Sequence, residues 1–175
     1  MNPKPFYLFA ALFAFLIFVS SSSYAQTVTQ GKWRFSFGAE GGLPVGNIKD
    51  YSNFELGGTI RAQYGLKAGL ALTFTSGYYN FFAKKIEIPG LGFTKLDDAG
   101  IIPVKVGIKS FLGNNFYWAA EAGAGFETPG GPVKLILSPG IGYATTSWDI
   151  GARYEHFTQS HQSFGMVALR AAYGF

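Results

Sequence analysis

The feature that most constrains this chain is an alternation of apolar with polar or small side chains, repeated in eight segments. Side chains on a β-strand point to opposite faces in turn, so each segment predicts a strand with one apolar face. We find no helical period after the first 25 residues, and the sequence therefore predicts an all-β fold. The eight segments are residues 33–42, 54–66, 68–82, 101–111, 116–127, 134–143, 148–157 and 165–175.

The last of these segments predicts how the sheet closes. Its apolar face continues to the final residue of the sequence, whereas the opposite face carries Arg170 among small residues. A strand of this kind suits the closing strand of a barrel, which must pair with the first strand. Its apolar residues also resemble the carboxy-terminal signal that outer-membrane barrels present to their assembly machinery. These residues are Val167, Leu169, Ala171, Tyr173 and Phe175.

Residues 1–25 predict a cleaved signal peptide. Lys4 is the only charge in this segment, residues 6–19 are almost wholly apolar, and the residues up to Ala25 end in a small-x-small pattern. An apolar run of about 14 residues is shorter than the roughly 20 that a membrane-spanning helix needs, so an uncleaved anchor is the less favoured alternative. Cleavage would make Gln26 the first mature residue and leave residues 26–175 as one domain.

Composition favours a membrane barrel over a soluble domain. Charged residues make up 14% of the chain, against about 25% in typical soluble domains, and aromatic residues make up 18%. Cysteine is absent, which excludes a disulfide framework and a thiolate metal site. The formal net charge of +4 is small, and the sequence has no run of basic residues, so we expect no nucleic-acid partner.

Alternation alone does not decide which face of the barrel points inward, because a soluble barrel of the lipocalin type has the same period. Two observations favour lipid on the outside. Aromatic residues such as Trp33, Tyr64 and Trp148 lie near segment ends on the apolar face, as in interfacial girdles. The opposite face is rich in Gly, Ala, Ser and Thr, which suits a narrow lumen. The sequence therefore predicts an eight-stranded antiparallel up-and-down transmembrane β-barrel.

The polar face also carries charged residues, which we expect to fill the lumen. An eight-stranded barrel is only wide enough for its own side chains, and buried charges need partners. We predict a network of ion pairs that plugs the barrel, with a proton or ion path through it as the alternative. The residues are Arg34, Glu40, Arg61, Lys105, Lys109, Glu121, Asp149, Arg153, Glu155 and Arg170.

The links between segments alternate in length, which predicts the orientation of the barrel. Residues 65–67, 113–115 and 145–147 form tight turns, whereas residues 43–53, 83–100, 128–133 and 158–163 form longer links. An even number of strands leaves both termini on one side, which we assign to the periplasm, with the longer links outside. The longest link, 83–100, is charged and has Pro89-Gly90 near its middle, so we expect it to be solvated and mobile.

Two features of the sequence could indicate a ligand-binding or a catalytic site. The aromatic runs 78–82 and 116–118 could stack sugars or bases, but their place at segment ends favours an interfacial belt. Segments 154–159 and 161–163, with His156 and His161, resemble the His-x-Ser region of a lipid A deacylase. Residues 165–175 lack the acid that would orient such a histidine, and Thr158 stands in place of serine. We therefore expect no catalytic residue, no metal and no cofactor.

Residues 41–46, 70–78 and 102–109, with the terminal Phe175, resemble the small outer-membrane β-barrel proteins of Bacteroidetes, related in shape to the OmpX and OmpA barrels. The resemblance covers the whole mature chain. It implies a multi-pass protein of the outer membrane of a Gram-negative bacterium, surrounded by lipid and lipopolysaccharide. Its partners during biogenesis would be the barrel-assembly machinery and periplasmic chaperones. It supplies no catalytic residue and names no ligand.

The function expected from these observations is a structural or surface-interaction role for a monomeric barrel without catalysis. The first alternative is a porin-like protein, that is, a narrow channel or carrier for small or apolar solutes. The second alternative is a lipid A-modifying enzyme at the outer rim. A channel or carrier would need an open path through the interior of the barrel, and an enzyme would need a catalytic group at its outer rim.

Overall fold

The computed structural model describes residues 29–88, 92–95, 97–159 and 162–175. The predicted signal peptide, with its cleavage between Ala25 and Gln26, lies outside these residues. Within the described residues, no helix is both long enough and apolar enough to cross a membrane.

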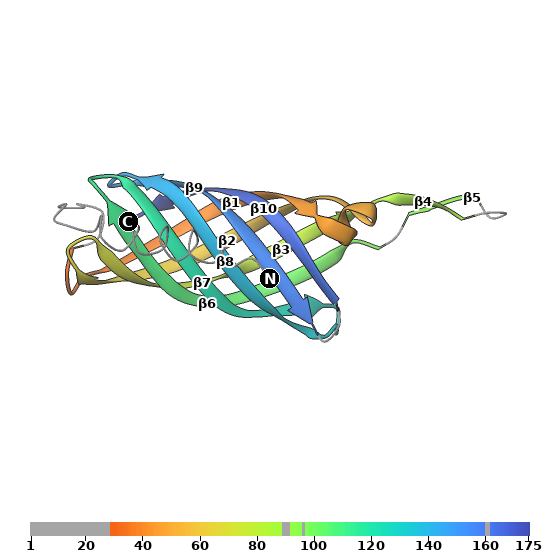
Figure 1. The fold of residues 1–175 in the computed structure, drawn as a ribbon, viewed down its shortest axis with the longest axis horizontal. Coiled ribbons are helices and arrows are strands. Elements are labelled where there is room, and N and C mark those ends of the chain that lie inside the picture. The colour runs from red at the N-terminus through yellow and green to blue at the C-terminus, as the bar shows by residue number, and fades with distance from the viewer. Residues whose placement is uncertain (1–28, 89–91, 96, 160–161) are drawn as a thin grey trace, which may run out of the picture.

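Eight long strands form one closed antiparallel barrel (Figure 1), which confirms the predicted fold. Seven of the pairings join strands that follow one another around the barrel in chain order, and the eighth joins the last strand to the first. The strands are β1 (Trp33–Val45), β2 (Ser52–Lys67), β3 (Leu70–Ala83), β6 (Ala99–Leu112), β7 (Phe116–Thr128), β8 (Val133–Ala144), β9 (Trp148–Gln159) and β10 (Gln162–Gly174).

The pairing of β10 with β1 closes the barrel. The register runs from Ser36 opposite Gly174 to Val45 opposite Gly165. Beyond β10, Phe175 still exchanges two backbone hydrogen bonds with Phe35, with N···O distances of 2.9 and 3.1 Å. The five alternate residues of the terminal segment, including Leu169 and Phe175, are exposed on the outer face of this seam.

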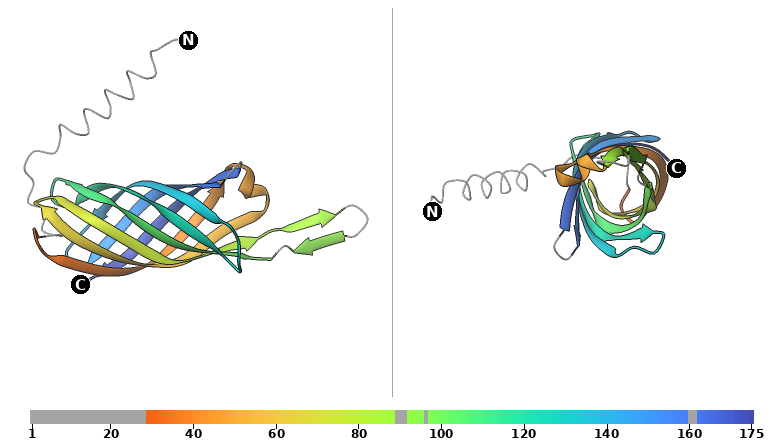
Figure 2. Two further views of the ribbon diagram at one scale, coloured as in Figure 1. Left: turned by 90° about the horizontal axis from the view of Figure 1, so that it is seen from below. Right: turned by 90° about the vertical axis from the view of Figure 1, so that its right-hand side faces the viewer.

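The longest link differs from the prediction, because it contains two further strands. Strand β4 (Lys85–Ile88) pairs with β5 (Gly92–Lys95) in a separate two-stranded sheet. Figures 1 and 2 show this hairpin projecting beyond the end of the barrel opposite to the C-terminus. The sequence did not predict it because four residues give too short an alternation to separate a strand from a charged loop.

The other links are shorter than predicted or differ in their bounds. Residues Gln159 and Gln162 are paired across β9 and β10, so both strands extend into the predicted fourth link, residues 158–163. The first link contains the short 3-10 helix η1 (Gly46–Asp50). The first tight turn comes after Lys67 rather than at 65–67, because Gly69, with φ of 76°, can adopt the left-handed backbone that the turn needs.

The apolar face of the sheet points outward, as predicted. Large apolar side chains are exposed on every barrel strand, and Ile141 and Leu169 are 67% and 64% exposed. Aromatic pairs surround the end of the barrel that holds the tight turns. Their ring centroids lie 5.0 Å apart for Trp33 and Tyr64, 5.1 Å for Phe116 and Tyr143, and 5.6 Å for Trp148 and Tyr173. An exterior of this kind is stable in hydrocarbon and not in water.

Candidate functional site: the interior of the barrel

The interior of the barrel contains a middle layer of charged side chains, which is the candidate site. All ten predicted residues are buried on inward positions of their strands. Nine of them form ion pairs with one another. Most of these pairs join strands that are not neighbours in the sheet, whereas Lys105 with Glu121 and Arg170 with Asp149 join neighbouring strands, and Arg153 with Glu155 lies within β9. We call this set, together with the tyrosine and hydroxyl groups that bind it, the ionic layer.

Glu121 on β7 is the first centre of the ionic layer. Its carboxylate lies 3.1 Å from Nη2 of Arg61 on β2 and accepts a hydrogen bond of 2.7 Å from the hydroxyl of Thr75. Arg61 in turn donates from Nε to the same hydroxyl oxygen at 2.8 Å. Lys105 lies 3.9 Å from the carboxylate on another side. Glu121 therefore links strands β2, β3, β6 and β7 across the lumen.

Asp149 on β9 is the second centre. It accepts hydrogen bonds of 2.6 Å from both Lys109 and the hydroxyl of Tyr117. Arg61 and Arg170 each lie 3.9 Å from the same carboxylate oxygen that Lys109 contacts. Three bases therefore share the charge of one acid at this centre.

Glu155 on β9 is the third centre. Arg153 lies 2.9 Å from its carboxylate through Nε, and Lys105 forms a closer ion pair with the same oxygen. Arg153 also pairs with Glu40 on β1 and donates a hydrogen bond of 2.6 Å to the hydroxyl of Tyr79. Nearer the end of the barrel that holds the tight turns, Arg34 donates to the backbone carbonyl of Thr146 at 2.7 Å.

One buried acid was missed by the sequence analysis. Glu55 on β2 is 1% exposed, and neither of its carboxylate oxygens has a hydrogen-bond partner among the described residues. It lies against glycine, since a methyl group added at Gly42 would come within 2.8 Å of Oε2. The signal was present, because extending the inward period of Gly57, Thr59 and Arg61 by one step reaches this position.

Apolar side chains also fill part of the lumen, which the sequence analysis did not predict. At the end near the hairpin, Phe157 and Phe164 stack with ring centroids 4.6 Å apart, and Phe81 packs edge-on to both at 6.1 and 6.0 Å. We call these rings and the buried residues packed with them the outer apolar layer. Its other buried members are Tyr79, Ile101, Ile136, Met166 and Ala168. A smaller cluster of Ala71, Phe111, Tyr117 and Ala144 lies at the opposite end.

The two aromatic runs are therefore not simple interfacial belts. Tyr79 and Phe81 point inward and are buried, whereas Tyr78 is 46% exposed on the outer face. In the second run Tyr117 is buried and Phe116 is 64% exposed. The interpretation as a belt was wrong for the inward half of each run, because alternation sends neighbouring aromatic residues to opposite faces.

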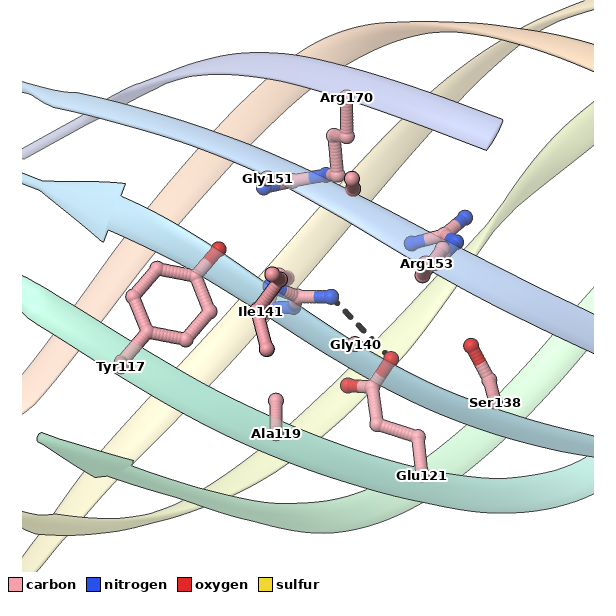
Figure 3. Close-up of a pocket in the computed structure, with 11 residues that line it drawn as sticks. Tyr117, Ala119, Glu121, Ser138, Gly140, Ile141, Gly151, Arg153 and Arg170 are labelled. Atoms are coloured by element: carbon pink, nitrogen blue, oxygen red, sulfur yellow. Dashed lines mark hydrogen bonds and ion pairs between the residues drawn. The ribbon is translucent and has the colours of Figure 1, made fainter. Parts of the chain in front are cut away.

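A small cavity lies within the ionic layer. Its volume is about 20 Å³, and its lining includes Arg61, Tyr117, Glu121, Arg153 and Arg170 (Figure 3). A cavity of this size holds about one water molecule. In Figure 3, Arg153 and Arg170 reach from β9 and β10 into the space that Tyr117 and Glu121 face from β7.

The described part of the chain gives little support for catalysis at the outer rim. His156 is half-buried on the outer face of β9, with its ring 6.3 Å from that of Tyr154. Its neighbour Glu155 points into the lumen and is bound there by two bases. His161 lies outside the described residues. No group of three or more His, Cys, Asp or Glu in the described segments could hold a metal ion.

Comparison with known proteins shows the fold and not a family. No protein-family model matches the chain, and no curated protein matches it. Among solved structures, the attachment invasion locus protein Ail of Yersinia pestis has a TM-score of 0.61 at 15% identity, covering 84% of this chain and all of Ail. The N-terminal β-barrel domain of OprF from Pseudomonas aeruginosa has a TM-score of 0.58 at 12% identity, covering 83% and 98% of the two chains.

The outer membrane protein OprG from Pseudomonas aeruginosa has a TM-score of 0.50 at 10% identity, covering 86% of this chain and 98% of OprG. These structures are small outer-membrane β-barrels. At such low identities the likeness describes the shape of the chain and says nothing about what it binds.

Proposed function

We propose that this protein is a closed, integral outer-membrane β-barrel with a structural or surface-interaction role and no catalytic activity. Both termini face the periplasm, and the hairpin β4–β5 faces the outside of the cell. The protein is a monomer surrounded by lipid and lipopolysaccharide, and it is delivered by periplasmic chaperones and the barrel-assembly machinery. Kinship with the Bacteroidetes barrels stays a prediction from the sequence.

The observation that carries this proposal is the filling of the lumen. The ionic layer is bounded on one side by the outer apolar layer and on the other by the cluster around Phe111 and Tyr117. An ion entering from outside would have to displace packed aromatic rings and then separate ion pairs in an interior of low dielectric. Both steps are costly, so we expect that the barrel does not conduct ions. Its role is then structural, or it depends on interactions made by its outer end.

Conductance in planar lipid bilayers tests this closure. We expect no steady single-channel steps from the refolded barrel, whose folding is checked by its heat-modifiable migration on a gel. Steady steps in preparations of the folded band would contradict the closure and favour the alternative of a narrow channel or carrier.

The outer end supplies the surface for interaction. A cavity of about 130 Å³ lies at the mouth of the barrel, lined mainly by apolar residues such as Ile48, Tyr51, Ile101 and Phe164. The hairpin β4–β5 extends beyond it (Figure 2). Ail has been solved with the heparin analogue sucrose octasulfate. The longest link here balances three lysines with three acids, so we do not extend polyanion binding to this chain.

Protease treatment of intact cells tests the orientation. An epitope tag placed between β4 and β5 is expected to be removed by external protease, whereas a tag inserted directly after Gln26, the predicted first mature residue, should survive until the outer membrane is opened. The reverse pattern would overturn the proposed orientation. Membrane fractionation of the same cells tests the location.

The enzyme alternative has a direct test. We expect the acylation pattern of lipid A, measured by mass spectrometry, to be the same with the natural protein, with His156→Ala and with His161→Ala. An acyl loss that requires either histidine would contradict the proposal and establish a lipid A-modifying activity.

A further inference from the structure

The cavity of about 130 Å³ at the outer end of the barrel, here called the mouth cavity, is enclosed by several elements. Its described lining comes from η1, from Tyr51 and from the ends of six strands, β2, β3, β6, β7, β8 and β10. Figure 1 shows η1 at the same end of the barrel as the hairpin. Phe81, Ile101 and Phe164 in this lining are members of the outer apolar layer, and none of the described lining residues belongs to the ionic layer. The mouth cavity therefore lies against the apolar layer.

The polar side chains of the mouth cavity are bound by protein groups or exposed to solvent. Lys134 pairs with Glu127 and donates a hydrogen bond of 3.2 Å to Gln159. The hydroxyl of Ser52 donates to a backbone carbonyl at 3.1 Å. Asp97 is exposed, so its carboxylate is solvated. The buried part of the lining therefore offers a ligand apolar surface to pack against, rather than a charge to pair with.

The size of the mouth cavity limits what it can hold. An engineered cavity of about 150 Å³ lined by aliphatic and aromatic side chains stays dry and binds benzene, because water finds no polar partners there. The mouth cavity has nearly this volume, and Phe81 and Ile101 in its lining are 3% and 2% exposed. A single aromatic ring with a small substituent fits this space, whereas a two-ring compound or an acyl chain is too large.

We propose that the mouth cavity binds one small, uncharged, single-ring aromatic molecule, held by packing against Phe81, Ile101 and Phe164. A charged group on the ring is disfavoured, because it would leave water without a buried partner of opposite charge. The proposal rests on the surface role proposed above and makes it specific. The ligand is bound at the mouth and is not passed through the barrel, because the outer apolar layer and the ionic layer lie beneath it.

A titration with toluene tests the site, and benzoate serves as the charged counterpart. The refolded barrel in lipid nanodiscs, labelled at its isoleucine methyl groups, is followed by NMR. We expect the signals of Ile48 and Ile101 to shift with toluene and to saturate, with a dissociation constant on the order of 1 mM. Ile150, exposed on the outer face, should show only the unsaturated shift of toluene dissolved in lipid. Benzoate should leave Ile48 and Ile101 unchanged.

A matched pair of variants separates the mouth cavity from the rest of the surface. Ala99→Leu enlarges a side chain of the lining and should weaken toluene binding at least about tenfold. Ala122→Leu makes the same change at an exposed position on the outer face and should leave binding unchanged. Both variants are first checked for the heat-modifiable folded band. Full binding by folded Ala99→Leu, or shifts at Ile48 and Ile101 that never saturate in the natural protein, would overturn the site.

A crystal of the natural barrel under xenon pressure gives a second measurement that needs no variant. Xenon enters dry apolar cavities, so we expect a xenon peak among Phe81, Ile101 and Phe164. Ordered water molecules in place of xenon would show that the cavity is wet and would overturn the proposal. Steady conductance steps together with a toluene titration that still saturates would instead overturn the closed interior and leave this site in place, so the two failures are distinguishable.

Discussion

Two neighbouring layers of the lumen, the ionic layer and the outer apolar layer, are filled by different forces. In the ionic layer one acid can pair with several bases, and Asp149 is shared by Lys109, Arg61 and Arg170. In the outer apolar layer Phe157 packs against two other rings, and these three phenylalanine rings have no polar atom that needs a hydrogen-bond partner. Loss of one side chain should therefore affect the whole ionic layer but only the immediate surroundings in the apolar one.

The largest effect is expected from Asp149→Leu, because it leaves three buried bases without their shared acid. Breaking a buried ion pair by removing one partner costs about 3–5 kcal/mol, and we expect the upper part of that range. Equilibrium urea unfolding in lipid vesicles, followed by tryptophan fluorescence, measures it. The double variant Lys109→Met with Asp149→Leu is the matched control and should recover part of the loss. A cost under about 1 kcal/mol would show that the acid is not central.

Phe157→Ala should cost less, about 3 kcal/mol, because it removes a buried ring and leaves a cavity without stranding a charge. Phe157→Leu, which keeps most of the volume, should cost under about 1.5 kcal/mol. The same unfolding assay compares both with Asp149→Leu. If Phe157→Ala proved the more damaging of the two, the apolar layer rather than the ionic layer would dominate the interior.

The smallest effect is expected on conductance when the outer apolar layer is opened. The triple variant Phe81→Ala, Phe157→Ala, Phe164→Ala should remain silent in planar bilayers, because the ionic layer still fills the middle of the lumen. The heat-modifiable band confirms that the variant is folded before it is tested. Steady steps from this variant alone would show that the aromatic rings form the seal.

The fold could be predicted from the sequence because the alternation of apolar and polar side chains is a local property. The eight barrel strands and their outward apolar face follow from a period of two, which each segment displays within about ten residues. The charged residues of the interior lie on inward positions for the same reason. The hairpin β4–β5 was missed because its strands are four residues long.

The pairing within the interior could not be predicted from sequence. Arg61 on β2 meets Glu121 on β7, which is not a neighbouring strand, and such contacts depend on the stagger of all the strands between them. The inward place of Tyr79 and Phe81 was missed for a related reason. An aromatic residue near a strand end suits both a membrane interface and the top of a lumen, and only its face on the strand decides between them.

The seam between β1 and β10 has a consequence for how copies of this protein accumulate. It joins positions as distant along the chain as Ser36 and Gly174, so the two open edges of the sheet persist until the whole polypeptide has arrived. Unpaired strand edges cannot be tolerated in hydrocarbon. A shortened product would have no stable resting place in the bilayer and would be left to degradation, so the membrane is expected to retain only full-length copies.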